Sequence, residues 1–228
     1  MGWEAIAVGG DARGDLFRLE HLIDGAEYAL AGTKRVLKFA DQEIQTGPLV
    51  RAFEMPPHQR AAAGLGRTFQ NIRLFRSMTA LENVEIGAER RGNTMIGKGG
   101  DAALTERAME ALTFVGLGAR ANELIPSFSY GHQRLIEIAR ALAANPTLLL
   151  LDEPAAGLNS TEKLDLHELL KRIAALGLTI LIIDHDMTLV SEAAQHITVL
   201  NFGRRIADGE SMAVLRHPDV VSAYLGSE

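Results

Sequence analysis

The stretch FSYGHQRLIEIARALAANPTLLLLDEPAAGLN, residues 128–159, decides the fold of this chain. Small residues at 129–132 form a turn that opens a helix, which the sequence predicts over about residues 133–144. Asn145 and Pro146 end this helix, because proline has no amide hydrogen to donate and disfavours helical geometry in the residue before it. The four leucines at 148–151 are too few for a buried helix, so they predict a central strand of a parallel sheet, covered on both faces.

Two carboxylates, Asp152 and Glu153, follow this strand directly, at the end where ligands of open α/β sheets bind. Burying both without a partner would be costly. A divalent cation beside a phosphate is the usual solution, with Asp152 near the metal and Glu153 facing an attacking water. The alternative is an ordinary strand end with two solvated acids.

Three motifs in this stretch resemble those of the ATP-binding subunits of ABC transporters, and within that family those of the branched-chain amino acid importers. Residues 148–153 resemble the Walker B strand with its catalytic glutamate, Glu153. Residues 129–133 resemble the signature turn, with Tyr130 at its second small position. Residues 155–159 resemble the D-loop, with Asn159 where many relatives carry aspartate. The resemblance implies an α/β fold, with a P-loop NTPase-like core, a mainly parallel sheet and a helical subdomain.

Composition limits the classes of protein to which the chain can belong. Its 228 residues are 47% hydrophobic, which suits one packed domain with a subdomain. The net charge of −6 gives no basic surface for nucleic acid, and the absence of cysteine fits a reducing compartment. No apolar run approaches the roughly 18–20 residues of a membrane span, and no signal peptide opens the chain, so we expect no direct membrane insertion.

The phosphate-binding loop that the family carries ahead of these motifs is not found. Such a loop reads G-x-x-x-x-G-K-[ST] between a strand and a helix. Residues 7–15 contain glycines but no lysine, and residues 32–34 carry the residue types in the wrong order. Residues 92–98 have both glycines and the lysine, but Gly99 replaces the hydroxyl residue and no strand precedes them, so they predict a flexible loop.

We expect a single ABC-type ATPase domain over residues 1–228, with an atypical N-terminal part at 1–55. The helical subdomain is expected at 73–140, and the RecA-like core with the C-terminal tail at 141–228. Within the N-terminal part, residues 36–40 could form a strand and 15–22 a strand or short helix, while 56–63 predict a proline-capped helix. The family resemblance is continuous from about residue 57. A wrongly set reading frame, an altered sequence or true loss could each explain what precedes it.

Residues 66–75, GRTFQNIRLF, resemble the Q-loop, whose glutamine, here Gln70, reaches the metal and the attacking water in the family. The permease is then expected to dock near residues 70–78. Leu74, Phe75 and Met78 would suit a groove for a partner's helix, or they could simply pack in the subdomain core. Thr79 and Glu82 predict a capping box at the start of the next helix.

The second half of the chain predicts alternating helices and strands. Asn159 with Glu162 resembles a helix start signal, and leucines and an isoleucine at helical spacing predict a helix over 162–175. A buried strand is predicted at 178–183. His185, one strand after the Walker B strand, resembles the family's switch histidine. Residues 197–201 and 204–207 predict an antiparallel pair, and the tail from residue 211 resembles that of the amino acid importers.

In the family, two subunits close head to tail over two ATP molecules. The resemblance therefore implies ATP and Mg²⁺ as cofactors, a second ABC ATPase subunit (identical or different), a membrane permease, and a cytoplasmic place on the inner face of the membrane. Its site residues carry over by motif. They are Glu153, His185 and Gln70 as catalytic residues, Asp152 and Gln70 at the metal, and Ser129, Tyr130, Gly131, His132 and Asn159 at the nucleotide.

Two other functions stay open at this point. Losing one preorganised donor typically costs about 10²–10³ in rate, so without the lysine loop the chain alone is expected to bind and hydrolyse ATP poorly. It could then be a non-hydrolysing or half-site subunit that completes a partner's site through Ser129 and Gly131. A DNA-repair-type ABC ATPase is less favoured, because the chain has neither a heptad-bearing insertion nor a basic face.

Overall fold

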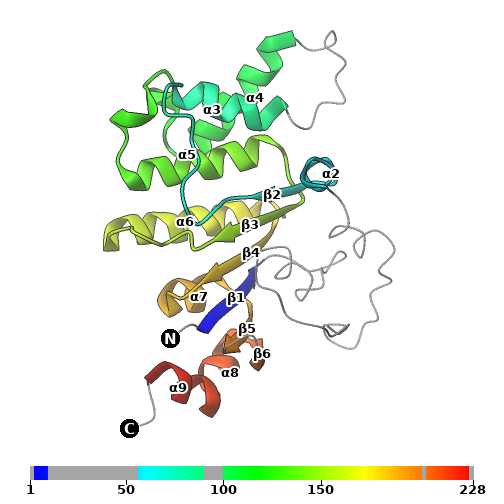
Figure 1. Cartoon of the computed structure of the whole chain (residues 1–228), viewed down its shortest axis with the longest axis vertical. Coiled ribbons are helices and arrows are strands. Elements are labelled where there is room, and N and C mark those ends of the chain that lie inside the picture. The colour runs from blue at the N-terminus through cyan, green and yellow to red at the C-terminus, as the bar shows by residue number, and fades with distance from the viewer. Residues whose placement is uncertain (1–2, 10–55, 90–99, 202–203, 226–228) are drawn as a thin grey trace.

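We describe the protein from a computed structural model that defines residues 3–9, 56–89, 100–201 and 204–225. One sheet contains six strands in the order β2-β3-β4-β1-β5-β6. The strands are β1 (Trp3–Gly9), β2 (Leu65–Arg67), β3 (Leu148–Asp152), β4 (Thr179–Asp184), β5 (His196–Asn201) and β6 (Arg204–Glu210). The helices are α2 (Pro57–Ala62), α3 (Ala80–Glu89), α4 (Gly100–Phe114), α5 (Tyr130–Ala143), α6 (Ser160–Ala175), α7 (Met187–Ala193), α8 (Ser211–Leu215) and α9 (Pro218–Leu225), with short 3-10 turns η1 (Gly118–Arg120) and η2 (Ile125–Ser127). Figure 1 shows α3, α4 and α5 gathered at one end of the molecule and α8 and α9 at the other.

The leucine run forms a buried, parallel strand, as the sequence predicts. Strand β3 lies between β2 and β4 and pairs in parallel with both. Leu148, Leu149 and Leu151 are at most 1% exposed, because other elements cover both faces of the strand. The predicted antiparallel pair of β5 and β6 is also present, with a register shift between Val199 and Leu200.

The signature helix α5 begins three residues earlier than the sequence analysis predicts. The side chain of Ser129 accepts a hydrogen bond from the amide of His132 and caps the helix, so residues 130–132 belong to its first turn. The predicted end of the helix is nearly right. Asn145 adopts the left-handed conformation with φ 48°, which asparagine tolerates after a helix, and Pro146 prevents continuation.

The helices α3, α4 and α5 pack against one another through small and apolar side chains, and Val84, Leu112 and Ile136 are fully buried among them. The predicted capping box at the start of α3 is confirmed, because Thr79 and Glu82 each bind the other's backbone amide, at 2.7 and 3.1 Å. Helix α4 begins at Gly100, although two consecutive glycines, Gly99 and Gly100, disfavour a helix start.

Several predictions fall outside the described residues. These are the elements at 15–22 and 36–40, the phosphate-loop candidates beyond residue 9, and the loop at 92–98. The proline-capped helix is confirmed as α2, with proline in its first turn. The division into parts at 1–55, 73–140 and 141–228 stays a prediction. Across the described ranges, we find no helix with the length and apolar character that crossing a membrane requires.

Candidate functional site

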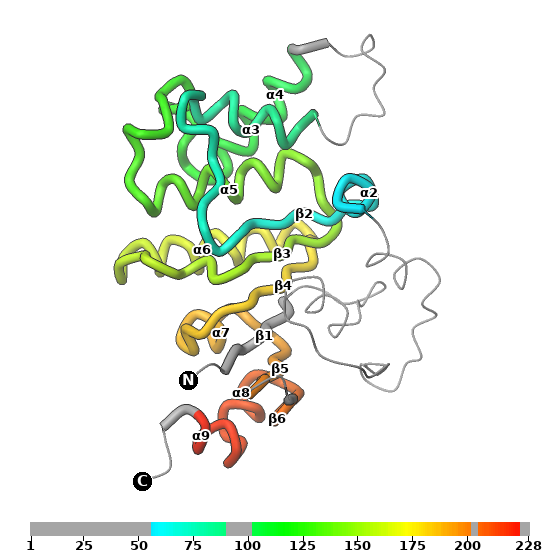
Figure 2. The backbone as a smooth tube through the Cα atoms, in the orientation of Figure 1, coloured from blue at the N-terminus to red at the C-terminus, as the bar shows by residue number. Residues whose placement is uncertain are grey.

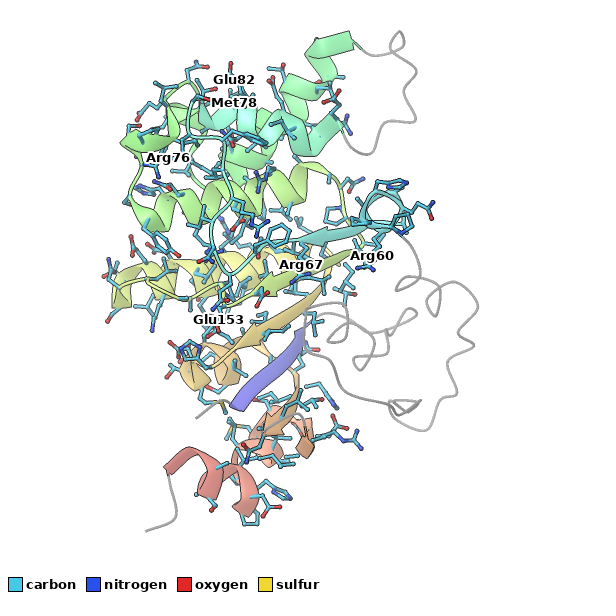
Figure 3. The ribbon with its side chains drawn as sticks, viewed as in Figure 1. Arg60, Arg67, Arg76, Met78, Glu82 and Glu153 are labelled. Carbon is cyan, nitrogen blue, oxygen red and sulfur yellow. The ribbon has the colours of Figure 1, made fainter. Side chains whose placement is uncertain are left out.

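The acidic pair lies where the parallel strands end. Asp152 is paired in register with Ile183 of β4, so both strands finish at the same edge of the sheet. The amide of Glu153 donates to the carbonyl of Ile183 at 2.7 Å. Glu153 has φ 43°, which is rare for a side chain with a Cβ and turns the chain sharply out of the strand. Figure 3 shows Glu153 beside the ends of β3 and β4.

Two residues from the end of β2 reach this acidic pair. The amide nitrogen Nε2 of Gln70 donates to Oε2 of Glu153 at 2.9 Å. Arg67 places Nη2 3.2 Å from Oδ2 of Asp152, with both side chains partly exposed. Because β2 is parallel to β3 and lies beside it, residues more than 80 positions apart in sequence meet at one edge.

His185 completes the group that the sequence analysis singled out. Its Nδ1 lies 3.8 Å from Oε1 of Glu153 and 3.8 Å from Oδ1 of Asp184, and its side chain is 61% exposed. Asp184 is buried and accepts hydrogen bonds from the amides of Ala155 and Asp186, so it fixes both turns beside the site. Gln70, Asp152, Glu153 and His185 therefore converge. The alternative of two independently solvated acids does not describe this arrangement.

The turn after β4 is anchored at Asp186, the residue that follows His185. Asp186 caps α7 through the amides of Thr188 and Leu189, and binds Nζ of Lys163 from α6 at 2.6 Å. Burial alone would raise the pKa of Asp186. The bonds from Lys163 and the two amides outweigh burial and hold that pKa below its ordinary value. Asp186 thus stays ionised and anchors the turn that carries His185.

The signature residues lie around the start of α5. Ser129 and Tyr130 are exposed, whereas Gly131 is buried against the carboxylate of Glu162, which an added Cβ would overlap. His132 has Nδ1 3.4 Å from Nη1 of Arg120. Among the described residues, no hydrogen bond or ion pair joins this group directly to the acidic pair. This chain therefore presents two separate parts of a site, one at the strand ends and one at the helix start.

Asn159 has a structural task in this chain. Its Oδ1 accepts from the amide of Glu162 at 3.0 Å, and the carboxylate of Glu162 accepts from the amide of Asn159 at 3.0 Å. This reciprocal capping box confirms the predicted start signal of α6. Next to it, Gly157 has φ 76° and would bring a Cβ within 3.0 Å of Tyr130 Cε1, so the turn and the signature helix pack closely.

Sequence reasoning missed three residues near the site. Arg67 lies within the GRTFQ motif, and no local pattern connects it to Asp152. Arg134 and Glu137 are 0% and 1% exposed, although they are charged. The signal that could have found this pair is its i, i+3 spacing on the apolar face of a helix, where a lone charge would be costly.

The donor set fits Mg²⁺ only in combination with a phosphate ligand. Within the described part of the chain, no group of three or more acidic or histidine side chains is arranged to hold a metal ion by itself. Mg²⁺ usually takes one or two carboxylates and completes its shell with water and substrate phosphates. Asp152 and Glu153 supply carboxylate oxygens of this kind. Gln70 can add its side-chain oxygen, because its bond to Glu153 uses the nitrogen Nε2 instead.

Strand β1 ends at the opposite edge of the sheet from the acidic pair. It runs antiparallel to β4, with Ala5 opposite Asp184 and Gly9 opposite Ile180. The chain therefore leaves β1 beside the first residues of β4, at the edge of the sheet opposite Asp152.

The family described as ABC transporter matches residues 29–156, which begins earlier than the resemblance at residue 57. The high-affinity branched-chain amino acid transport ATP-binding protein BraF of Pseudomonas aeruginosa is 41% identical over 182 residues, covering 75% of this chain and 71% of BraF.

Solved ATP-binding cassettes share the fold. An ATP-binding cassette of an ABC transporter in its ADP conformation is 32% identical with TM-score 0.65, covering 76% of this chain and 72% of that one. A dimeric cassette in a post-hydrolysis state with ADP and Pi is 27% identical with TM-score 0.61, covering 70% and 69%. These likenesses agree with the α/β, P-loop NTPase-like fold.

Proposed function

Because this chain belongs to the ABC transporter family, we propose that it is the ATP-binding subunit of an importer for branched-chain amino acids. The convergence of Gln70, Asp152, Glu153 and His185 at one edge of the sheet carries the proposal. The likeness to BraF, whose name specifies branched-chain amino acid transport, supports the substrate class. The DNA-repair reading gains no support from these relatives.

The site geometry suits hydrolysis of a phosphoanhydride. Glu153 accepts a hydrogen bond from Gln70, which fixes its carboxylate in position to polarise a water molecule. His185 lies on the other side of the same carboxylate, within reach of a terminal phosphate. Mg²⁺, held by Asp152 and assisted by Gln70, would neutralise charge on the phosphates. Each role uses a side chain that a neighbouring strand or capped turn already holds.

The signature residues are proposed to act on a second subunit. Ser129 and Tyr130 are exposed at the N-terminal end of a 14-residue helix, where backbone amides favour an anion. They lie apart from this chain's own acidic pair, as a site shared between two subunits requires. The dimeric relative bound to ADP and Pi supports this arrangement. Gly131, His132 and Asn159 would then support the turn from behind.

Residues 70–78 are proposed to receive the permease. Phe75 is 52% exposed, and its backbone is held at both ends by the fully buried Asn83, which accepts from its amide and donates to its carbonyl. Leu74 packs against the core instead. The exposure of Phe75 therefore suits a docking surface for a partner's helix, whereas Leu74 packs in the core. A subunit that docks on a permease in this way would lie at the inner face of the cell membrane, and we include this location in the proposal.

Transport in reconstituted vesicles tests the proposal. The chain is combined with its permease and binding protein, and uptake of leucine, isoleucine and valine is measured against arginine with ATP inside. We expect ATP-dependent uptake of the three branched-chain amino acids, and a loss of at least 100-fold in Glu153→Gln, in line with about 10²–10³ for loss of one catalytic group. Lys171→Met, at an exposed pair on α6, is the matched control. Equal uptake by Glu153→Gln and Lys171→Met would contradict the site.

A nucleotide titration distinguishes the ATP binding of the isolated chain from that of the assembled transporter. Because no lysine loop is found in the sequence, the isolated chain is expected to bind and hydrolyse ATP weakly compared with the assembled transporter. Fluorescent ATP binding and phosphate release are measured on both. Full turnover by the isolated chain would refute the expectation about the loop, and absence of nucleotide binding by both would refute the proposed function.

A further inference from the structure

The segment that carries Gln70 is held by the signature helix. Figure 2 shows the chain leaving β2 and passing along α5 before it reaches α3. Arg134 of α5 donates from Nη1 to the carbonyl of Phe69 at 2.7 Å and from Nη2 to the carbonyl of Gln70 at 2.8 Å. Two consecutive carbonyls are therefore bound by one planar guanidinium, a geometry that fixes both position and orientation.

Two further side chains of α5 hold the same segment. Oε1 of Glu137 accepts from the amide of Arg73 at 3.4 Å, and Nη1 of Arg140 donates to the carbonyl of Arg73 at 2.6 Å. Glu137 also accepts from Nη1 of Arg134 at 2.7 Å. The spacing i, i+3, i+6 puts all three charged residues on one face of the helix. The loop backbone is thus bound at four points between Phe69 and Arg73.

Stability does not account for this arrangement. Arg134 and Glu137 are 0% and 1% exposed, and Nε of Arg134 has no acceptor in the described part of the chain. Desolvating two charges is expensive, and well-packed apolar residues often serve a fold equally well. What apolar residues could not do is bind the carbonyls of Phe69 and Gln70 and the amide of Arg73. The charged pair therefore points to a role in placing the loop.

We propose that Arg134, Glu137 and Arg140 form a clamp through which the signature helix positions Gln70 against Glu153. The carbonyl of Gln70 is fixed by Arg134, and its side chain then reaches Glu153 at 2.9 Å. Helix α5 begins with the residues that face a second subunit, so a displacement of that end is transmitted to Gln70 of the same chain. These are positioning residues, since none of them touches the acidic pair. The consequence for Gln70 rests on the proposed function, whereas the clamp itself does not.

Tyr130 links the clamp to the turn after the acidic pair. Its hydroxyl lies 3.5 Å from Nη2 of Arg134, and its ring packs against Gly157. The exposed Tyr130 in the first turn of α5 is therefore in contact with the guanidinium that holds Gln70. A second subunit that binds this surface would therefore act on the clamp through the side chain of Tyr130.

A spin label tests the clamp without nucleotide. The chain contains no cysteine, so Asn71→Cys at the exposed residue after Gln70 gives a single labelling site. Arg134→Lys keeps a positive charge for Glu137 but loses the fork that binds two carbonyls. Arg140→Met removes the bond to Arg73 from a side chain that is 17% exposed, so it remains informative if Arg134→Lys fails to fold. Lys171→Met, from an exposed i, i+3 pair on α6, is the control.

We expect greater label mobility in both clamp variants, and amide exchange across residues 68–74 about tenfold faster, as loss of one hydrogen bond implies. Exchange in β3 and label mobility in Lys171→Met should match the parent. Unchanged mobility and exchange in folded Arg140→Met would overturn the clamp.

The assembled transporter tests the role in positioning. Arg140→Met should lower kcat with little change in KM, and should have no further effect when Gln70→Ala is already present. Effects that multiply independently in the double variant would overturn the positioning role, even if the clamp holds the loop. The spin-label and exchange measurements stand whether or not the proposed function is correct, so the two failures are distinguishable.

Discussion

Replacing Arg67 with methionine should strengthen binding of a divalent cation at Asp152. Nη2 of Arg67 lies 3.2 Å from Oδ2 of Asp152, so the guanidinium neutralises the carboxylate that would hold a metal. A metal ion and Arg67 therefore compete for the same oxygen. Methionine keeps an unbranched apolar side chain and removes the guanidinium, which makes Arg67→Met the suitable perturbation.

The size of the effect follows from the exposure of the pair. The side chains of Arg67 and Asp152 are 34% and 23% exposed, so solvent screens their attraction. Ion pairs of this kind contribute about 1 kcal/mol at most. Removing the competitor should therefore tighten metal binding by about fivefold, since each 1.4 kcal/mol is a factor of about ten.

Mn²⁺ serves as the probe, because its free and bound forms are distinguished by electron paramagnetic resonance. Mn²⁺ is titrated into the assembled transporter with a non-hydrolysable ATP analogue present, for wild type, Arg67→Met, Arg67→Lys and Asp152→Asn. Lysine keeps the competing charge and should leave the affinity close to that of wild type, whereas Asp152→Asn should abolish site-specific binding. Arg76→Met, at an exposed arginine between β2 and α3, controls for the change in net charge. Equal or weaker Mn²⁺ binding by Arg67→Met than by Arg76→Met would refute the competition.

Three further predictions concern the scaffold of the site. Gly87→Ala should lower the free energy of urea unfolding by about 2 kcal/mol, because the new Cβ would lie 2.9 Å from a carbonyl carbon of α5 and closer still to its oxygen. Gly177→Ala, at a residue with φ 81° and open space around it, should lower it by only about 1 kcal/mol. Equal stability of Gly87→Ala and wild type would contradict the close packing of α3 and α5. The hydrogen bond from Arg120 lowers the pKa of Glu123 from 4.5 to about 2, so its stabilising effect is present above pH 4.5 and is lost as pH falls toward 2. The difference in urea midpoint between wild type and Glu123→Gln should shrink over that interval, and a constant difference would count against the ion pair. Asn159→Ala should lose about 1 kcal/mol in thermal unfolding through its capping box, while Asn159→Asp should lose little; equal losses would rule out capping as the cause.

The sequence alone was sufficient for features that depend on residues close together in the chain. The leucine run is buried as β3, the box of Asn159 and Glu162 starts α6, and the bend at Asn145 and Pro146 ends α5. Each depends on contacts or backbone preferences within a few residues. The convergence of Gln70, Glu153 and His185 was anticipated through motif resemblance and the rule that parallel strands end at one edge.

Tertiary structure decided the contacts between distant segments. Arg67 meets Asp152 across 85 positions, and Arg134 meets the carbonyl of Phe69 across 65. No periodicity predicts such pairs, because they depend on which strands become neighbours and on the path of the chain past a helix. The antiparallel direction of β1 is of the same kind, since a strand's own residues favour pairing but the rest of the sheet selects its direction.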